Sequence, residues 1–350
     1  MTDPAVPPDA AYDPIGRLAE LIGGEAMAEL DADMGAVLDM LGRLGARPLE
    51  QLTPAAARQQ PRLRDAVAAL VAQAGATTDE DGVATEELML EGTGEAMAGR
   101  LYRPAVLADR LNPMVLYFHG GGFVTGDLDS HDASARALAR QTGAIVLSVD
   151  YRLAPEHAFP AAHDDAWAAW TWLGNQAHRL SGDPRRMAVV GEDAGANLAA
   201  HVALLARMGR SHHPVRQVLI HPVAGTALNT DSYTENRRAR PIGLAAMRWR
   251  LQQLFPAGVP DSEPHLQLAA RTDLAGVAPA TIVLARIDPL RSEGEDLAAA
   301  LQQAGVPVSC MIYEGVTQGF FGLGRLVNKA LFAQGDVADA LARAFAATAR

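Results

Sequence analysis

From residue 114 onward, the sequence alternates short apolar runs with longer stretches whose apolar residues recur every three to four positions. The apolar runs cover residues 114–119, 144–149, 187–191, 215–220, 280–285 and 306–313. The stretches with helical spacing lie near residues 131–141, 163–179, 194–208, 291–304 and 326–349. Because the runs are continuous rather than alternating, they are typical of strands buried on both faces. The pattern predicts an α/β fold, with a mostly parallel central sheet and helices on both of its faces.

Three further regions complete the predicted architecture. Residues 15–75 carry apolar residues at helical spacing, with prolines between the segments. The runs "EELMLE" (86–91) and "GRLYRP" (99–104) are expected to be antiparallel strands at the edge of the sheet. Residues 228–262 include "GLAAMRWRLQQLF", which predicts a helical insertion between two strands, placed to act as a lid.

The formal net charge of −11 makes nucleic acids and anionic membranes poor partners. Much of it lies in residues 1–33, where eight acidic residues face one arginine, and we expect an acidic N-terminal extension there. No apolar run approaches the roughly 18 residues of a membrane span, and the acidic, proline-rich start does not resemble a secretory signal. A cytoplasmic location is therefore expected. Cys310, the only cysteine, lies in an apolar run and is predicted to be a buried thiol.

The stretch "VVGEDAGANLAAH" (189–201) has the outline of a nucleophile elbow. An apolar strand end meets small residues at Gly191, Ala194 and Gly195 and then a helix, the setting in which hydrolases carry Gly-x-Ser-x-Gly. The central residue of this chain is Asp193. A helix N-terminus beside that position favours the charged form of the carboxylate.

A glycine-rich loop, "HGGGF" (119–123), directly follows a predicted strand. Glycines let backbone N–H groups approach a ligand oxygen, and with an amide after the elbow residue they form an oxyanion hole. Gly121, Gly122 and Ala194 are the predicted donors. A charged Asp193 that turned toward them would fill the hole and oppose acyl transfer.

Four stretches in the same order resemble the hormone-sensitive-lipase family of α/β-hydrolases, in its bacterial esterase branch. They are "YFHGGGFVTGDLDSHD", "VDYRLAPEHAFPAAHDDAWAAWTWL", "VVGEDAGANLAAHVA" and "RIDPLRSEGEDLAAALQQAGVPV". The resemblance covers about residues 34–350. It implies an α/β-hydrolase core over 84–350, with a helical cap made by 34–83 and by the insertion at about 228–262. It also implies small apolar esters as usual substrates and suggests a homodimer through an edge strand and a nearby helix.

The resemblance also assigns the positions of the family's Ser–Asp–His triad. The serine position is Asp193, the acid position is Asp288, and the histidine position is Gln318 in "QGF". Triad chemistry needs an alcohol and a base that takes and returns its proton. Since a glutamine amide can hydrogen-bond but cannot shuttle a proton, efficient carboxylesterase activity is not expected.

One hypothesis is a repurposed enzyme of biosynthesis that performs non-hydrolytic acid/base chemistry of the cyclase, lyase or isomerase type. Its ligand would be a small apolar metabolite that contains a carbonyl group. Asp193 would act as acid or base, Gln318 would orient the ligand or Asp193, and Asp288 would hold Gln318. Glu192 adds a third acid, and like charges in a partly dry pocket raise one pKa, so one carboxyl would stay protonated. His119 and Glu192 complete the predicted ligand contacts.

Two alternatives stay open from the sequence. The chain can bind a small molecule without catalysis, as relatives without the triad histidine do. It can also hydrolyse esters, either weakly or with Asp193 as nucleophile. An aspartate at the elbow is the nucleophile of haloalkane dehalogenases and epoxide hydrolases, which resemble this chain only in fold. Those enzymes need a histidine to clear the ester intermediate, and His221 is the best outside candidate. No histidine pair has metal-ligand spacing, and no metal or other cofactor is expected.

Overall fold

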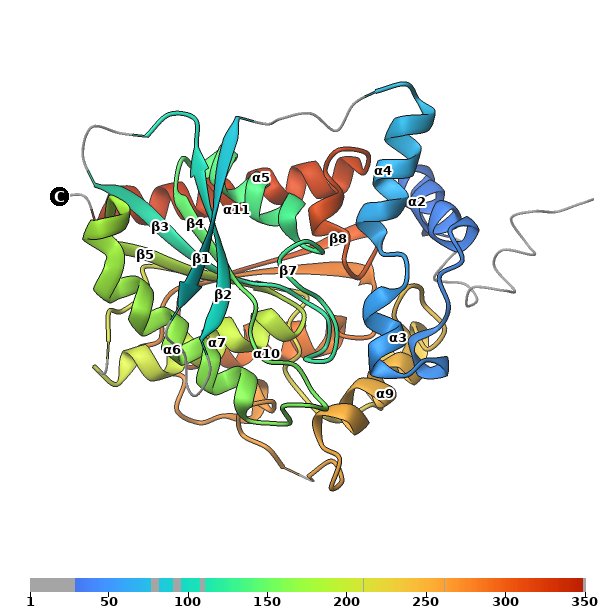
Figure 1. Cartoon of the computed structure of the whole chain (residues 1–350). Coiled ribbons are helices and arrows are strands. Elements are labelled where there is room, and N and C mark those ends of the chain that lie inside the picture. Colours follow the sequence, from blue (N-terminus) through green and yellow to red (C-terminus); the bar gives the residue numbers. More distant parts are fainter. Residues whose placement is uncertain are drawn as a thin grey trace, which may run out of the picture.

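The structure is a computed structural model of the 350-residue chain. It describes residues 29–76, 82–90, 96–107, 111–209, 211–260 and 262–348. Nearly all of the predicted acidic extension, including the helical pattern at residues 16–28, lies outside the described residues. Figure 1 shows the arrangement of the elements.

Within the described residues, eight strands form one sheet in the order β1-β2-β4-β3-β5-β6-β7-β8. The strands are β1 (Val83–Leu90), β2 (Met97–Pro104), β3 (Asn112–Phe118), β4 (Ile145–Val149), β5 (Gly182–Glu192), β6 (Gln217–Ile220), β7 (Ala280–Ile287) and β8 (Val308–Thr317). The β1–β2 and β2–β4 pairs are antiparallel, and the remaining pairs from β4 to β8 are parallel. The predicted mostly parallel sheet with two antiparallel edge strands is confirmed.

Helices cover both faces of the sheet (Figure 1). One face packs against α5 (Asp132–Thr142) and α11 (Asn328–Ala347), and the other against α6 (Ala161–Gln176), α7 (Ala194–Arg207) and α10 (Arg291–Gln303). On β3, Leu116 belongs to one apolar core and Val115 to the other, and both side chains are fully buried. Burial on both faces explains why β3 is continuously apolar from Met114 to Phe118.

A group of helices lies beside the sheet, on the side of α4 and α9 in Figure 1, and we call it the cap. Its members are α2 (Ala32–Arg43), α3 (Pro54–Gln59), α4 (Leu63–Gln73) and α9 (Leu244–Leu254). The helix α9 lies between β6 and β7, inside the predicted insertion, as does α8 (Asp231–Glu235), which contacts α10. Arg58 of α3 joins the cap to the core, since its guanidinium donates to the carbonyls of Val124 and Ala154 at 2.8 Å each.

The prediction for Cys310 is wrong, because this residue is exposed. It lies on β8, which pairs on one side with β7 and stands at the end of the sheet, so its apolar run is only partly covered.

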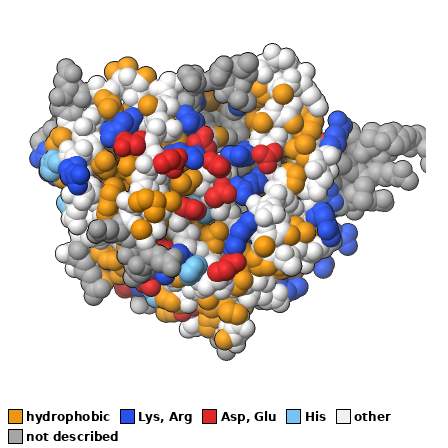
Figure 2. Space-filling view, viewed as in Figure 1, with side chains coloured by type: hydrophobic (Ala, Val, Ile, Leu, Met, Phe, Trp, Pro, Cys, Tyr) orange, Lys and Arg blue, Asp and Glu red, His pale blue; other side chains and the backbone are white. Residues whose placement is uncertain are grey.

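Acidic and basic side chains are interspersed with apolar ones on the face in Figure 2. Among the described residues, no helix is both long and apolar enough to cross a membrane.

Candidate active site

The predicted elbow forms between the end of β5 and the start of α7. Asp193 has φ 55° and ψ −115°, a conformation that is strained for a residue with a side chain. A Cβ atom on Gly191 would overlap the carbonyl of Gly195, and one on Gly195 would overlap the carbonyl of Phe118. The small residues are therefore required by the tight turn that presents the Asp193 side chain.

The Asp193 carboxylate fills the oxyanion hole. The backbone amides of Gly121 and Gly122 each donate a hydrogen bond to Asp193 Oδ2 at 2.9 Å. Gly122 adopts φ 62°, a left-handed conformation that suits glycine. Ala194 is buried, but it donates no hydrogen bond to the Asp193 side chain within the described chain. Two of the three predicted donors thus meet the elbow residue itself, as expected for a carboxylate turned into the hole.

Arg250 supplies a third partner that the sequence did not predict. Its Nη1 lies 3.1 Å from Asp193 Oδ2, and both side chains are buried. Arg250 belongs to α9, where it shares the buried face with Ala246, Met247 and Leu254. A charged residue on an otherwise apolar stripe was the available signal, because a buried charge is stable only when it is paired.

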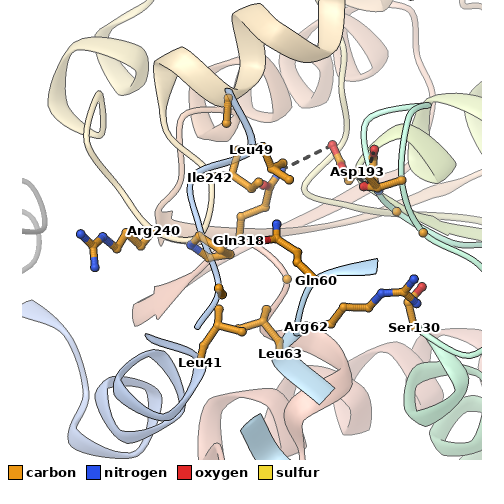
Figure 3. A pocket seen from close by; sticks show the side chains of 18 of the residues that line it. Leu41, Leu49, Gln60, Arg62, Leu63, Ser130, Asp193, Arg240, Ile242 and Gln318 are labelled. Atoms are coloured by element: carbon orange, nitrogen blue, oxygen red, sulfur yellow. Dashed lines mark hydrogen bonds between the residues drawn. The ribbon is translucent and has the colours of Figure 1, made fainter. Parts of the chain in front are cut away.

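Gln318 lies on the other side of the Asp193 carboxylate. Its Nε2 is 3.4 Å from Asp193 Oδ1, which is a long hydrogen bond, while Gln318 Oε1 is buried without a partner within the described chain. Figure 3 shows Gln318 and Asp193 facing each other in the cavity. One carboxylate oxygen is therefore held by three donors, and the other has only a weak contact.

Asp288 is completely buried behind this site. Its Oδ1 accepts the amide N–H of Leu290 at 2.9 Å, and its Oδ2 has no hydrogen-bond partner in the described part of the chain. Burial raises the pKa of Asp288 to about 8, and the charge of Asp193 adds to the rise. The expected protonated carboxyl is therefore Asp288. No hydrogen bond joins it to Gln318 among the described residues, so the predicted hold on Gln318 is not formed.

The two remaining predicted contacts differ in their position. Glu192 is buried, lines the cavity, and accepts a hydrogen bond from the Tyr117 hydroxyl at 2.6 Å. His119 is buried outside the cavity lining, where its Nδ1 lies 2.8 Å from the carbonyl oxygen of Gly120 and its ring stacks on Tyr151. Glu192 stays a candidate site residue, and the ligand contact of His119 stays a prediction for a ring that stacks on Tyr151 outside the cavity lining.

A cavity of about 530 Å³ connects the elbow to the cap. Leu41, Leu49, Leu63 and Ile242 line it from the cap, and Asp193 lies deeper in the core (Figure 3). The volume is within the usual range for small-molecule sites. Arginines from residues 47–64 and from the insertion between β6 and β7 also line the cavity: Arg47, Arg62, Arg64, Arg237, Arg238, Arg240 and Arg250.

Comparisons with known proteins agree with the fold. A family model described as alpha/beta hydrolase fold matches residues 115–322, more than half of the chain. The chain belongs to the α/β-hydrolase family. Within this family, it is 41% identical over 254 residues to a carboxylesterase of Mycobacterium tuberculosis, covering 70% of this chain and 77% of that protein. It is 33% identical over 307 residues to an ethyl acetate hydrolase of Pseudomonas putida, covering 86% of this chain and 95% of that protein.

Solved structures of α/β-hydrolases give the same result. The archaeal esterase of Pyrobaculum calidifontis is 33% identical, with a TM-score of 0.80 over 91% of this chain and 99% of that one. A thermostable esterase from Pseudomonas putida is 29% identical, with a TM-score of 0.79 over 91% and 98%. The α/β-hydrolase fold predicted from the sequence is confirmed.

The prediction of non-hydrolytic cyclase, lyase or isomerase chemistry is contradicted. The relatives carry the names of carboxylesterases and ester hydrolases, which point to ester hydrolysis. The geometry gives a physical reason for the correction. Asp193 Oδ2 accepts two amide hydrogen bonds and lies 3.1 Å from Arg250 Nη1, so this oxygen is held by the protein rather than directed at a ligand.

Proposed function

We propose that this α/β-hydrolase hydrolyses small carboxylic esters with the carboxylate of Asp193 as nucleophile. The observation that carries the proposal is the unequal treatment of its two oxygens. Oδ2 is bound by the amides of Gly121 and Gly122 and by Arg250, while within the described chain Oδ1 has only the long contact with Gln318. A carboxylate held in this way presents one oxygen for attack and keeps the other in the oxyanion hole.

The filled hole determines which carbon of the ester is attacked. An acyl oxygen that developed negative charge would find the amides of Gly121 and Gly122 already occupied by Asp193. Attack of Oδ1 on the alkyl carbon avoids this problem. The Oδ1–carbon bond forms as the bond between that carbon and the ester oxygen breaks, and the acid leaves as a carboxylate that needs no proton. Gln318, which cannot donate a proton as an acid, is compatible with this step.

Arg250 is placed to receive the departing carboxylate. Its Nη1 contacts Asp193, and its Nε is buried without a hydrogen-bond partner within the described chain. A guanidinium binds carboxylates through several N–H groups, and such charge-assisted bonds are strong in a buried site. The unused donor supports a role in the first step.

The second step uses the oxyanion hole in its ordinary manner. Water attacks Cγ of the Asp193 ester, and Oδ2 carries the developing negative charge while bound to Gly121 and Gly122. Collapse of this intermediate breaks the bond between Cγ and Oδ1, and the alcohol leaves with the former Oδ1 atom. The water oxygen remains in the carboxylate, so Asp193 is regenerated.

The cavity supports a small ester with an accessible primary or benzylic alkyl carbon. Its volume is about 530 Å³, and apolar side chains of the cap face Asp193 across it (Figure 3). An apolar alkyl group can bury itself against these side chains, which favours binding in proportion to the area removed from water.

Benzyl acetate tests the proposal, because its benzylic carbon is open to attack. Wild-type protein should release benzyl alcohol, and Asp193→Asn should lower kcat about a thousandfold or more, since the nucleophile is lost. Asp39→Asn, at an exposed position on α2, is the matched control and should retain activity. Binding of the ester with neither turnover nor a covalent adduct would contradict the proposal and leave a binding protein.

We also propose a homodimer through β8, which has β7 on one side and stands at the end of the sheet. Its residues Ser309, Cys310 and Ile312 are exposed. Unpaired strand edges favour pairing with another chain. Light scattering coupled to size-exclusion chromatography should give twice the chain mass, and a monomer at micromolar concentration would refute this assembly.

A further inference from the structure

A second strained residue lies beside the elbow. His221 directly follows β6 and has φ 35°, so it is a left-handed residue with a side chain, like Asp193 at the end of the neighbouring β5. The amide of Asp193 donates to the carbonyl of Ile220 at 2.9 Å, which places the two turns side by side. His221 lines the cavity and is 1% exposed. Strained residues of this kind cluster at functional sites.

A buried carboxylate faces the His221 ring. Glu192 Oε2 lies 3.7 Å from His221 Nε2, and Glu192 Oε1 accepts the Tyr117 hydroxyl at 2.6 Å. Burial and the charge of Glu192 raise the pKa of Tyr117 well above its ordinary value, so this hydroxyl stays a donor. Glu192 is thereby fixed in place, and it favours the His221 tautomer that carries its proton on Nε2.

The other ring nitrogen of His221 has no protein partner. Nδ1 is buried and lacks a hydrogen bond within the described chain. A buried polar atom without a partner costs free energy, and in a cavity-lining residue it indicates an acceptor reserved for water or ligand. Nδ1 is thus free to take a proton while Glu192 stabilises the imidazolium that results.

His131 is excluded as a competing base by its contacts. All ten histidines lie within the described residues, and only His131 and His221 line the cavity. The amide of Gly120 donates to His131 Nε2 at 3.1 Å, and the Ser130 hydroxyl lies 2.8 Å from His131 Nδ1. Both ring nitrogens of His131 are therefore engaged in holding the glycine loop.

We propose that His221, oriented by Glu192, is the general base that activates the water which opens the Asp193 ester. This inference rests on the proposed function. The water oxygen bonds to Cγ of Asp193 while its proton moves to His221 Nδ1. When the bond between Cγ and Oδ1 breaks, the same proton passes to the leaving alcohol, and His221 returns to its neutral form. The second proton of the water then leaves the new Asp193 carboxyl for solvent, which regenerates the carboxylate.

The charges around His221 suit this role at neutral pH. Burial lowers the pKa of His221, the charges of Glu192 and Asp193 raise it, and those of His131 and Arg250 lower it. The net shift is downward, so the ring is neutral and able to accept a proton at pH 7. Activity should rise with pH as this ring loses its proton and then reach a plateau.

His221→Gln separates the two chemical steps. With benzyl acetate, this variant should still form the Asp193 ester but fail to open it. Intact-protein mass spectrometry should show one benzyl group per chain, and steady-state kcat should fall about a hundredfold or more, as expected when a general base is lost. His178→Gln, at an exposed position outside the cavity lining, is the matched control and should turn over the ester like the wild type without accumulating an adduct.

The outcomes distinguish the two proposals. If wild-type protein forms neither adduct nor product, the proposed function fails and His221 has no reaction to serve. If the wild type turns over and His221→Gln turns over equally well without an adduct, the assignment of His221 fails while the nucleophile stands.

Glu192→Gln is a second variant that does not depend on the folding of His221→Gln. It removes the charge that raises the pKa of His221. The acidic limb of the pH–kcat profile should therefore move to lower pH, and kcat at the plateau should fall. A merely structural Glu192 would leave the position of that limb unchanged, which would contradict the assignment.

Discussion

Replacement of Asp288 by asparagine should flatten the dependence of stability on pH above neutrality. Burial raises the pKa of Asp288 to about 8, from an ordinary value of 3.8. At pH 7 the unfolded carboxyl is ionised while the folded one holds its proton, so folding takes up a proton. A rise in pH therefore destabilises the folded state until the folded group ionises as well.

The magnitude follows from these two pKa values. Between about pH 7 and pH 8, the free energy of unfolding should fall by roughly 1 kcal/mol for one such group. Burial raises the pKa of Glu293 to about 8 as well, so it contributes a similar loss over the same interval. The buried His131, His163 and His201 have lowered pKa values of about 3, 4 and 2, so their effect falls mainly below pH 7.

The assay is urea unfolding at constant ionic strength, with the free energy of unfolding extrapolated to zero urea at each of several pH values. Wild-type protein should lose roughly 2 kcal/mol between about pH 7 and pH 8, and Asp288→Asn about half of that. Asp39→Asn, at an exposed position, should behave like the wild type. An unchanged slope in Asp288→Asn would refute the conclusion that this carboxyl is neutral beside Asp193 in the folded protein.

Three further variants test the site. Arg250→Met should lower kcat for benzyl acetate about a hundredfold, because the departing carboxylate loses its donor; an unchanged kcat would contradict that role. Gly122→Ala should destabilise the fold by about 1 kcal/mol or more in urea unfolding, since its Cβ would overlap Arg250 and its φ is 62°; wild-type stability would show that the loop tolerates a side chain. Asp193→Ser with Gln318→His should gain hydrolysis of p-nitrophenyl acetate at least tenfold over wild type, and no gain would show that Asp288 cannot support a restored triad.

The sheet could be predicted because burial on both faces leaves a local pattern in the sequence. The same reasoning failed for Cys310, since the position of β8 at the end of the sheet depends on strand order rather than on the run itself. The filled oxyanion hole was also foreseeable, because it joins two motifs whose geometry is fixed by glycines.

Other parts of the site depend on contacts between distant segments. Arg250 reaches Asp193 from a helix of the cap, and no local pattern specifies that pairing. The sequence singled out His221 but could not show that Glu192 faces its ring or that Nδ1 has no partner among the described residues. Such pairings become visible only when the ends of β5 and β6 are placed side by side.

A single turnover of benzyl acetate in water enriched in oxygen-18 tests the central claim most directly. Attack by Asp193 on the alkyl carbon predicts that the heavy oxygen appears in the Asp193 carboxylate, while the acetate and the first benzyl alcohol released stay unlabelled. Mass spectrometry of the peptide that contains Asp193, and of both products, measures this distribution. Heavy oxygen in the acetate, with none in the protein, would show direct attack on the acyl carbon and contradict the nucleophilic role of Asp193.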